Sequence, residues 1–256
     1  MSLAYALDPP VPRLGLVVLQ ADETIEADFR RLLPDAPLLV TRVPSGREVT
    51  RATLAAMEGE ITAACRLFPA GAAMSVVGYG CTSGTSVIGA ERVAALVRAG
   101  VDAAHVTEPV SALVALCRER GVRRLGFVSP YIEPVSRTLR DVLEDHGIAV
   151  ASFGSFAVAE EARVSRIDAA SVTAAARAHA ENVDAVFLSC TNLRTLPAIA
   201  ALDAPDTPDT PDAPDAPGLA VPVWSSNTVL AWHMARLAGT ETRDEIVSLK
   251  RAREEA

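Results

Sequence analysis

Two stretches of this chain repeat one pattern, in which a short apolar segment runs directly into a Cys-Thr pair. Residues 76–85 are Val-Val-Gly-Tyr-Gly-Cys-Thr-Ser-Gly-Thr, and residues 186–195 are Val-Phe-Leu-Ser-Cys-Thr-Asn-Leu-Arg-Thr. A helical pattern of apolar residues follows each pair. The repeat predicts a duplicated fold in which two equivalent turns each contribute one cysteine, Cys81 and Cys190, to a single site.

Strand-like and helix-like patterns alternate along the whole chain. The apolar run at residues 14–19 is echoed at residues 123–129, where the alternation starts again. Strands that alternate with helices predict parallel sheets covered on both faces. We therefore expect an α/β fold of two similar Rossmann-like lobes, each with a parallel four-stranded sheet. Ligands of such sheets bind beyond the carboxyl ends of the strands, which predicts an active site in the cleft between the lobes.

The restart of the pattern also predicts where each lobe begins and ends. The first lobe is expected to span residues 14–107 together with a C-terminal helix at about residues 226–240, and the second to span residues 108–225. Single helices are predicted over residues 49–67 and 86–98.

A Pro-Asp repeat occupies residues 203–218 and contains five of the acidic residues behind the net charge of −8. Proline at every third position favours an extended, solvated chain, so we expect a disordered insertion in the second lobe rather than a docking tether. The remaining charge is close to balanced, and the absence of a basic stripe argues against a nucleic-acid partner.

Composition also excludes several classes of protein. No apolar run approaches the roughly 20 residues that cross a bilayer, and the N-terminus lacks the pattern of a secretion signal. We therefore expect a cytoplasmic protein with no membrane partner. The four cysteines show no CxxC spacing and the four histidines are scattered, so neither a disulfide framework nor a metal site is expected.

The position of Cys81 and Cys190 suggests their chemistry. A strand that leads into a helix start places the thiol beside unpaired N–H groups, which is expected to move its pKa from about 8.5 toward neutrality. One thiolate can remove a proton next to a carboxylate while the opposite thiol returns one; alternatively, a thiolate can add to a cis alkene and leave after bond rotation. Small buried residues are the alternative interpretation, and we prefer it only for Cys65 and Cys117.

Polar residues at the strand ends and beside the cysteines are candidates for holding the substrate carboxylate. Tyr131 could donate its hydroxyl or serve as a surface cap, whereas Glu108 and the pair Glu160-Glu161 look like solvated helix starts. The candidate substrate-binding residues are Gln20, Asp22, Thr82, Ser83, Tyr131, Thr191 and Asn192.

Together, the two Cys-Thr motifs, Ser-Pro-Tyr at residues 129–131 and Val-Pro-Val-Trp-Ser-Ser-Asn-Thr at residues 221–228 resemble a known group of enzymes. They are similar to the maleate cis–trans isomerase and arylmalonate decarboxylase branch of the aspartate/glutamate racemase superfamily. The resemblance implies a two-lobed fold without a cofactor, with Cys81 and Cys190 as the catalytic pair. It implies carboxylate contacts from Thr82, Ser83, Tyr131 and Thr191.

Departures from that pattern bear on the substrate. Asp22 stands where maleate isomerases carry a substrate-binding Asn, and residues 156–160 lack their second Asn. A carboxylate at that place disfavours a dicarboxylate and favours a substrate with an ammonium group. The segments at residues 19–26 and 41–46 look like those of ectoine-utilisation members, whose substrates would be diamino-acid derivatives.

We therefore expect a racemase or isomerase of a small carboxylate that is amino-acid-like or ectoine-derived, possessing no cofactor and forming a homodimer or higher homo-oligomer. Three alternatives stay open: a maleate cis–trans isomerase, a malonate-type decarboxylase and a non-catalytic carboxylate-binding protein. The decarboxylases resemble one-cysteine relatives that lack the first thiol, so Cys81 argues against that activity.

Overall fold

The computed structural model describes residues 3–7, 13–203, 218–240 and 246–247. Most of the predicted Pro-Asp insertion, residues 204–217, lies outside them. The described chain forms two parallel four-stranded sheets with the same internal order. The α/β fold with two parallel four-stranded sheets is therefore confirmed, whereas the exact lobe boundaries stay a prediction.

The two sheets are built from equivalent strands. The first sheet has the order β2 (Leu38–Val43), β1 (Leu14–Leu19), β3 (Met74–Gly80) and β4 (Ala103–Thr107). The second has the order β6 (Ala149–Ser155), β5 (Arg124–Ser129), β7 (Ala185–Leu188) and β8 (Val223–Ser225). Since β3 and β7 hold the same place in their sheets, Cys81 and Cys190 follow equivalent strands.

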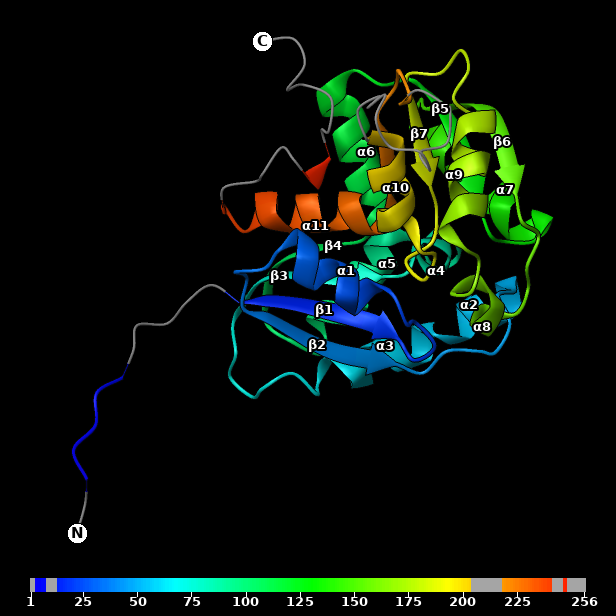
Figure 1. Ribbon diagram of the computed structural model, residues 1–256. Coiled ribbons are helices and arrows are strands. Elements are labelled where there is room, and N and C mark those ends of the chain that lie inside the picture. Colours follow the sequence, from blue (N-terminus) through cyan, green and yellow to red (C-terminus); the bar gives the residue numbers. More distant parts are fainter. Residues whose placement is uncertain (1–2, 8–12, 204–217, 241–245, 248–256) are drawn as a thin grey trace, which may run out of the picture.

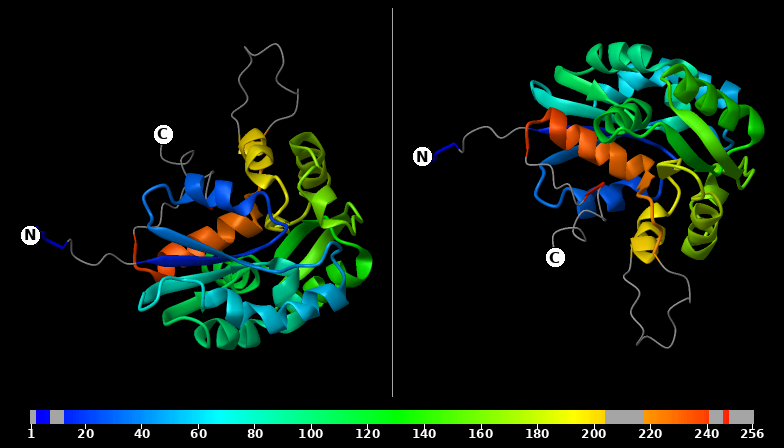
Figure 2. Two further views of the ribbon diagram at one scale, coloured as in Figure 1. Left: turned by 90° about the horizontal axis from the view of Figure 1, so that it is seen from below. Right: turned by 90° about the horizontal axis from the view of Figure 1, so that it is seen from above.

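Helices cover both faces of the sheets (Figures 1 and 2). In the first half of the chain they are α1 (Ile25–Leu32), α2 (Arg51–Ala56), α3 (Glu58–Cys65), α4 (Thr82–Ile88), α5 (Ala90–Arg98) and α6 (Pro109–Arg120). In the second half they are α7 (Glu133–Asp145), α8 (Glu161–Val164), α9 (Ala169–Ala178), α10 (Thr195–Asp203) and α11 (Ser226–Leu237). Every residue of β1 is buried, as expected of a central strand between two helical layers.

The C-terminal helix α11 joins the two halves. It follows β8 of the second sheet, yet it packs against β3 and β4 of the first sheet and against α1 and α6 (Figures 1 and 2). The side chains of Trp232 and Met234 are fully buried in these contacts. Helix α11 therefore fixes the first sheet relative to the second, and its N-terminus reaches the region between them.

Two predicted helices are each divided into two. The expected helix at residues 49–67 is α2 followed by α3, which meet at Met57. The expected helix at residues 86–98 comprises the end of α4, which begins earlier, directly after Cys81, and the whole of α5. Gly89 separates α4 from α5 with a φ of 93°, a backbone conformation that residues other than glycine rarely adopt.

Among the described residues, no helix has both the length and the apolar character needed to cross a membrane.

Candidate active site

The first Cys-Thr turn has relaxed backbone geometry. Cys81 is the N-cap residue of α4, with φ −149° and ψ 106°, and its Sγ accepts a hydrogen bond from Gly84 N–H at 3.1 Å. The Ser83 hydroxyl lies 3.8 Å from the same sulfur. The strand-to-helix turn predicted from the sequence is present here, and it aims backbone and hydroxyl donors at the sulfur.

The second turn differs. Cys190 has φ 106°, an unfavourable conformation for a residue with a side chain, and helix α10 starts only at Thr195. The expectation of a helix start at Cys190 is therefore wrong, because residues 191–194 form a turn first. The donors to the Cys190 sulfur are instead the Asn192 N–H and the Tyr131 hydroxyl.

A hydroxyl at the start of α11 connects the two turns. Ser226 Oγ accepts hydrogen bonds from the Thr82 hydroxyl at 2.8 Å and from the Cys190 N–H at 2.9 Å. The Thr191 hydroxyl adds a direct link by donating to the Gly80 carbonyl at 3.1 Å. These three fully or almost fully buried contacts bring the ends of β3 and β7 together.

Each cysteine also has a buried tyrosine beside it. The Tyr131 hydroxyl is hydrogen-bonded to Cys190, and the charges of both thiols act on it. The Tyr79 hydroxyl donates to Met57 Sδ at 4.0 Å, and it also interacts with the Cys81 side chain. Sequence analysis selected Tyr131 but missed Tyr79, because Tyr79 sits within an apolar strand and nothing local distinguishes it from a core residue.

The acidity of the thiols does not follow the sequence-based expectation. Burial raises the pKa of Cys81 to about 12, and burial raises the pKa of Cys190 well above its ordinary value. The hydrogen-bond donors to each sulfur lower the pKa of the thiol, but burial has the larger effect. The carboxylates Glu161 and Asp22 raise the pKa of both thiols further, which places both cysteines near the same two negative charges.

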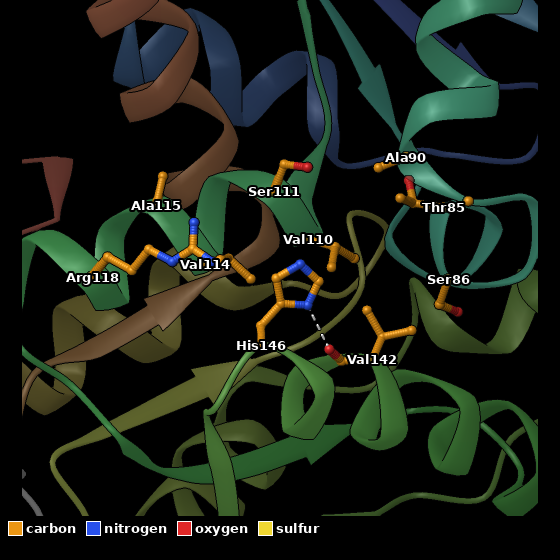
Figure 3. Close-up of a pocket in the computed structure, with 11 residues that line it drawn as sticks. Thr85, Ser86, Ala90, Val110, Ser111, Val114, Ala115, Arg118, Val142 and His146 are labelled. Carbon is orange, nitrogen blue, oxygen red and sulfur yellow. Dashed lines mark hydrogen bonds between the residues drawn. The ribbon is translucent and has the colours of Figure 1, made fainter.

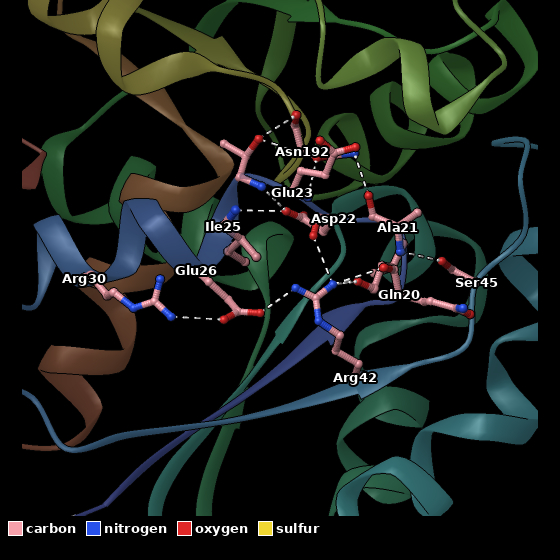
Figure 4. Close-up of polar contacts among 12 residues, drawn as sticks. Gln20, Ala21, Asp22, Glu23, Ile25, Glu26, Arg30, Arg42, Ser45 and Asn192 are labelled. Carbon is pink, nitrogen blue, oxygen red and sulfur yellow. Dashed lines mark hydrogen bonds and ion pairs between the residues drawn. The ribbon is translucent and has the colours of Figure 1, made fainter.

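Asp22 lies in the loop between β1 and α1 (Figure 4). Its side chain is 3% exposed, and Oδ1 accepts hydrogen bonds from the N–H groups of Thr24 at 2.8 Å and Ile25 at 2.9 Å. Within the described ranges, Oδ2 accepts no hydrogen bond. Burial raises the pKa of Asp22, so the carboxyl is poorly compensated.

Asn192 ties this loop to the second Cys-Thr turn (Figure 4). Its Oδ1 accepts from the Glu23 N–H at 2.8 Å, and its Nδ2 donates to the Ala21 carbonyl at 3.3 Å and to Glu161 Oε1 at 2.9 Å. The oxygen and the nitrogen of the Asn192 side-chain amide therefore both have partners within the protein. Asn192 therefore positions the loop in this structure, and its predicted contact with substrate stays a prediction.

The prediction that Glu160-Glu161 is a solvated pair is wrong for Glu161, which lies at the start of α8. Glu160 is exposed, but Glu161 is only 6% exposed, and burial raises its pKa. Its backbone N–H donates to the Arg47 carbonyl, which draws the start of α8 inward. No local sequence signal predicts this burial, since it comes from segments that are distant along the chain.

The other predicted site residues occupy different surroundings. Thr82 and Thr191 are buried and use their hydroxyl protons to join the turns, and Ser83 is buried next to Cys81. Gln20 is exposed, and its backbone carbonyl accepts from Arg42 (Figure 4). The roles of these four residues in substrate binding stay predictions.

A pocket of about 270 Å³ lies outside this cluster, between α4, α5, α6 and α7 (Figure 3). It is lined by Val110, Arg118 and His146, among others, and contains neither a thiol nor a carboxylate. Nearby Glu108 is almost fully buried and caps α6 by accepting from the Val110 and Ser111 N–H groups. The prediction that Glu108 starts a helix is confirmed, but the prediction that it is solvated is wrong.

Comparison with known proteins supports both the fold and the kind of site. The sequence model of the arylmalonate decarboxylase family matches residues 14–248. Arylmalonate decarboxylase of Bordetella bronchiseptica is 30% identical over 234 residues, which cover 89% of this chain and 91% of that protein. Maleate isomerase of Nocardia farcinica is 30% identical over 202 residues, covering 74% of this chain and 80% of that protein.

Solved structures have the same architecture. The maleate isomerase Iso of Pseudomonas putida S16 superposes with a TM-score of 0.78 at 23% identity, covering 94% of this chain and 98% of that one. A cysteine-to-serine variant of Nocardia farcinica maleate cis-trans isomerase superposes with a TM-score of 0.75 at 26% identity, covering 90% and 93%. That structure contains a covalently bound succinylcysteine intermediate.

Proposed function

The chain belongs to the arylmalonate decarboxylase family, and from this membership and its two joined Cys-Thr turns we propose that it is a cofactor-independent racemase or isomerase of a small carboxylate. The substrate is amino-acid-like or ectoine-derived. The observation that carries the proposal is that the two Cys-Thr turns meet: Ser226 Oγ accepts from the Thr82 hydroxyl and from the Cys190 N–H, and both cysteines are near the same carboxylates.

The reaction uses one thiolate and one thiol. In racemisation, the thiolate removes the proton from the carbon next to the substrate carboxylate, and the opposite thiol donates a proton to the other face. The charge that develops on the carboxylate is stabilised by hydroxyl donors such as Tyr131 and Ser83. At the end of the reaction the former thiolate carries a proton and the former thiol is a thiolate. Atoms and charge therefore balance without an external oxidant or reductant.

Cys81 is the better candidate for the thiolate. Its sulfur accepts the Gly84 N–H at 3.1 Å at the start of α4, and the Ser83 hydroxyl lies 3.8 Å from it. Cys190, with the Tyr131 hydroxyl beside it, is then the proton donor. Because burial raises the pKa of both thiols, we expect substrate binding to accompany the ionisation of Cys81.

Maleate cis–trans isomerisation fits the two-cysteine arrangement about equally. It is supported by the similarity to maleate isomerases, one of which is known with a succinylcysteine intermediate. In that reaction the Cys81 thiolate forms a C–S bond to one alkene carbon. The electron pair of the double bond passes to the other alkene carbon and its carboxylate. Rotation about the C–C bond, which is now single, and cleavage of the C–S bond then restore the double bond in the trans isomer and release the thiolate.

Proton NMR in heavy water tests the proposal and separates it from its alternatives. Maleate, aspartate, 2,4-diaminobutyrate and ectoine-derived acids are each incubated with the native protein. Loss of the α-proton signal supports racemisation, and a trans-alkene signal supports cis–trans isomerisation. Carbon dioxide release from a malonate would indicate the decarboxylase alternative, and binding without turnover would indicate a carboxylate-binding protein.

A further inference from the structure

The candidate site contains two buried carboxylates, Asp22 and Glu161, and the protein supplies little positive charge to them. Asp22 is 3% exposed and Glu161 is 6% exposed. Glu161 Oε1 accepts a neutral hydrogen bond from Asn192, and Asp22 Oδ1 accepts two backbone N–H groups. Among the described residues, no basic side chain forms an ion pair with either carboxylate.

The charge of Arg42 acts on Asp22, but the Arg42 guanidinium already has other partners. It donates to the backbone carbonyls of Leu19, Gln20 and Asp22 and pairs with Glu26 at 2.5 Å (Figure 4). Its charge still lowers the pKa of Asp22, yet burial outweighs that effect. Arg42 therefore supports the shape of the loop from outside the site. The nearby Thr191 hydroxyl also lowers the pKa of Asp22, but it donates to the Gly80 carbonyl, so Asp22 Oδ2 accepts no hydrogen bond among the described residues.

The Oδ2 atom of Asp22 indicates the kind of ligand that would bind here. Asp22 Oδ2 is a fully buried acceptor with no hydrogen bond in the described part of the chain. A buried acceptor without a partner is unfavourable, and a buried carboxylate without a cation is more so. A bound ligand that carries a cationic donor would satisfy both needs at once.

We infer that Asp22 and Glu161 form a subsite for a substrate ammonium group, next to the two cysteines. The inference rests on the proposed function in that it concerns the same site, and it newly assigns Glu161. An ammonium group has three N–H donors and one positive charge, which complements a site rich in acceptors. A dicarboxylate such as maleate would instead add two negative charges beside Asp22, Glu161 and a thiolate, which repel it.

Calorimetric binding to a Cys81→Ser/Cys190→Ser double variant tests the inference without turnover. The three probes are 2,4-diaminobutyrate, aspartate and maleate, which carry two, one and no ammonium groups. We expect 2,4-diaminobutyrate to bind at least about tenfold more tightly than maleate, with aspartate between them. Introducing Asp22→Asn or Glu161→Gln should each reduce that preference by about tenfold, mainly by weakening the binding of the ammonium probes.

Glu160→Gln is the matched control, because Glu160 is the exposed neighbour of Glu161. It should leave the preference unchanged. Equal or tighter binding of maleate, or a preference that survives both Asp22→Asn and Glu161→Gln, would overturn the inference.

The outcome is separable from that of the proposed function. Maleate turnover by the native protein, without any preference for ammonium probes, would overturn the subsite and leave the two-cysteine reaction in place. Selective binding of 2,4-diaminobutyrate, with no proton exchange or isomerisation of any probe, would retain the subsite and overturn the reaction.

Discussion

The two Cys-Thr turns are similar in sequence but differ in structure. Cys81 caps a helix in a relaxed, extended conformation, whereas Cys190 has φ 106° and is followed by a turn. The Cys190 N–H donates a hydrogen bond to Ser226 Oγ, and the Tyr131 hydroxyl donates one to the Cys190 sulfur. A strained backbone costs about 1–3 kcal/mol and persists only when neighbours hold it. The two turns therefore suit different roles: the Cys81 sulfur accepts an N–H at a helix start, whereas the Cys190 turn is held by Ser226 and Tyr131.

Replacing either cysteine by serine should have the largest effect. We expect Cys81→Ser and Cys190→Ser each to lower turnover by at least about a thousandfold, because each removes one of two groups that act as a unit. Mass spectrometry after incubation with an alkene acid tests the difference between them. Cys190→Ser should still form a covalent adduct at Cys81, whereas Cys81→Ser should not.

Cys65→Ser is the control, since Cys65 is buried on α3 away from both turns. It should affect stability more than turnover. Normal turnover in either Cys81→Ser or Cys190→Ser would contradict the shared role, and an adduct on Cys190 alone would reverse the assignment.

Adding a methyl group under Cys81 should disturb the relaxed turn. A Cβ atom at Gly84 would lie 2.8 Å from Cys81 Sγ and 2.9 Å from both Met57 Cε and the Tyr79 hydroxyl. Gly84→Ala should therefore displace the sulfur, reduce kcat by more than about tenfold and destabilise the fold by about 1–3 kcal/mol. Steady-state kinetics and urea unfolding measure the two effects.

Gly59→Ala is the matched control in helix α3. A Cβ atom at Gly59 would have open space around it, so the change should stabilise the protein by about 0.5–1 kcal/mol and leave kcat unchanged. Equal effects of the two substitutions on kcat would show that the space around Cys81 does not control its reactivity.

Removing the hydroxyl that joins the turns should have an intermediate effect. Ser226→Ala leaves the Thr82 hydroxyl and the Cys190 N–H without their buried acceptor. We expect a loss of about 1–3 kcal/mol in stability and a fall in kcat of about tenfold to a hundredfold as Cys190 relaxes from its strained conformation. Hydrogen exchange should speed up more at residues 189–192 than at residues 81–84.

Thr173→Ala is a suitable comparison, because the Thr173 hydroxyl donates to the Ala169 carbonyl within α9 and does not join the two turns. It should change neither kcat nor the exchange at the turns. Faster exchange at residues 81–84 than at residues 189–192 in Ser226→Ala would contradict the view that Cys190 is the turn that depends on its neighbours.

The sequence predicts the parts of the site that depend on local pattern. Alternating strands and helices led to the fold, and the repeated Cys-Thr pairs led to Cys81 and Cys190. It does not predict features that depend on packing. Glu161 is buried through contacts with Asn192 and Arg47, and the thiol pKa values are set by burial rather than by nearby donors. The strained Cys190 likewise donates its N–H to Ser226, which is distant along the chain.

The last expected effect is confined to stability and concerns the support of the Cys190 turn. Asn227 Nδ2 donates to Asp28 Oδ2 at 2.7 Å and to the Thr191 carbonyl at 2.9 Å, and burial raises the pKa of Asp28 to about 6. The folded protein therefore holds a proton on Asp28 more tightly than the unfolded chain does, whose Asp pKa is about 3.9. The resulting stabilisation is complete below about pH 3.9 and is lost as pH rises through 6.

Asp28→Asn should remove this pH dependence while keeping an acceptor for Asn227. Between pH 4 and pH 7, the free energy of unfolding of the native protein should fall by about 2–3 kcal/mol relative to that of Asp28→Asn, as measured by urea unfolding. Asp141→Asn, at an exposed position on α7, is the matched control. The native protein and Asp28→Asn should differ in how their free energy of unfolding depends on pH only if the pKa of Asp28 is shifted. The same pH dependence in both would therefore show that the Cys190 turn is supported without a proton on Asp28.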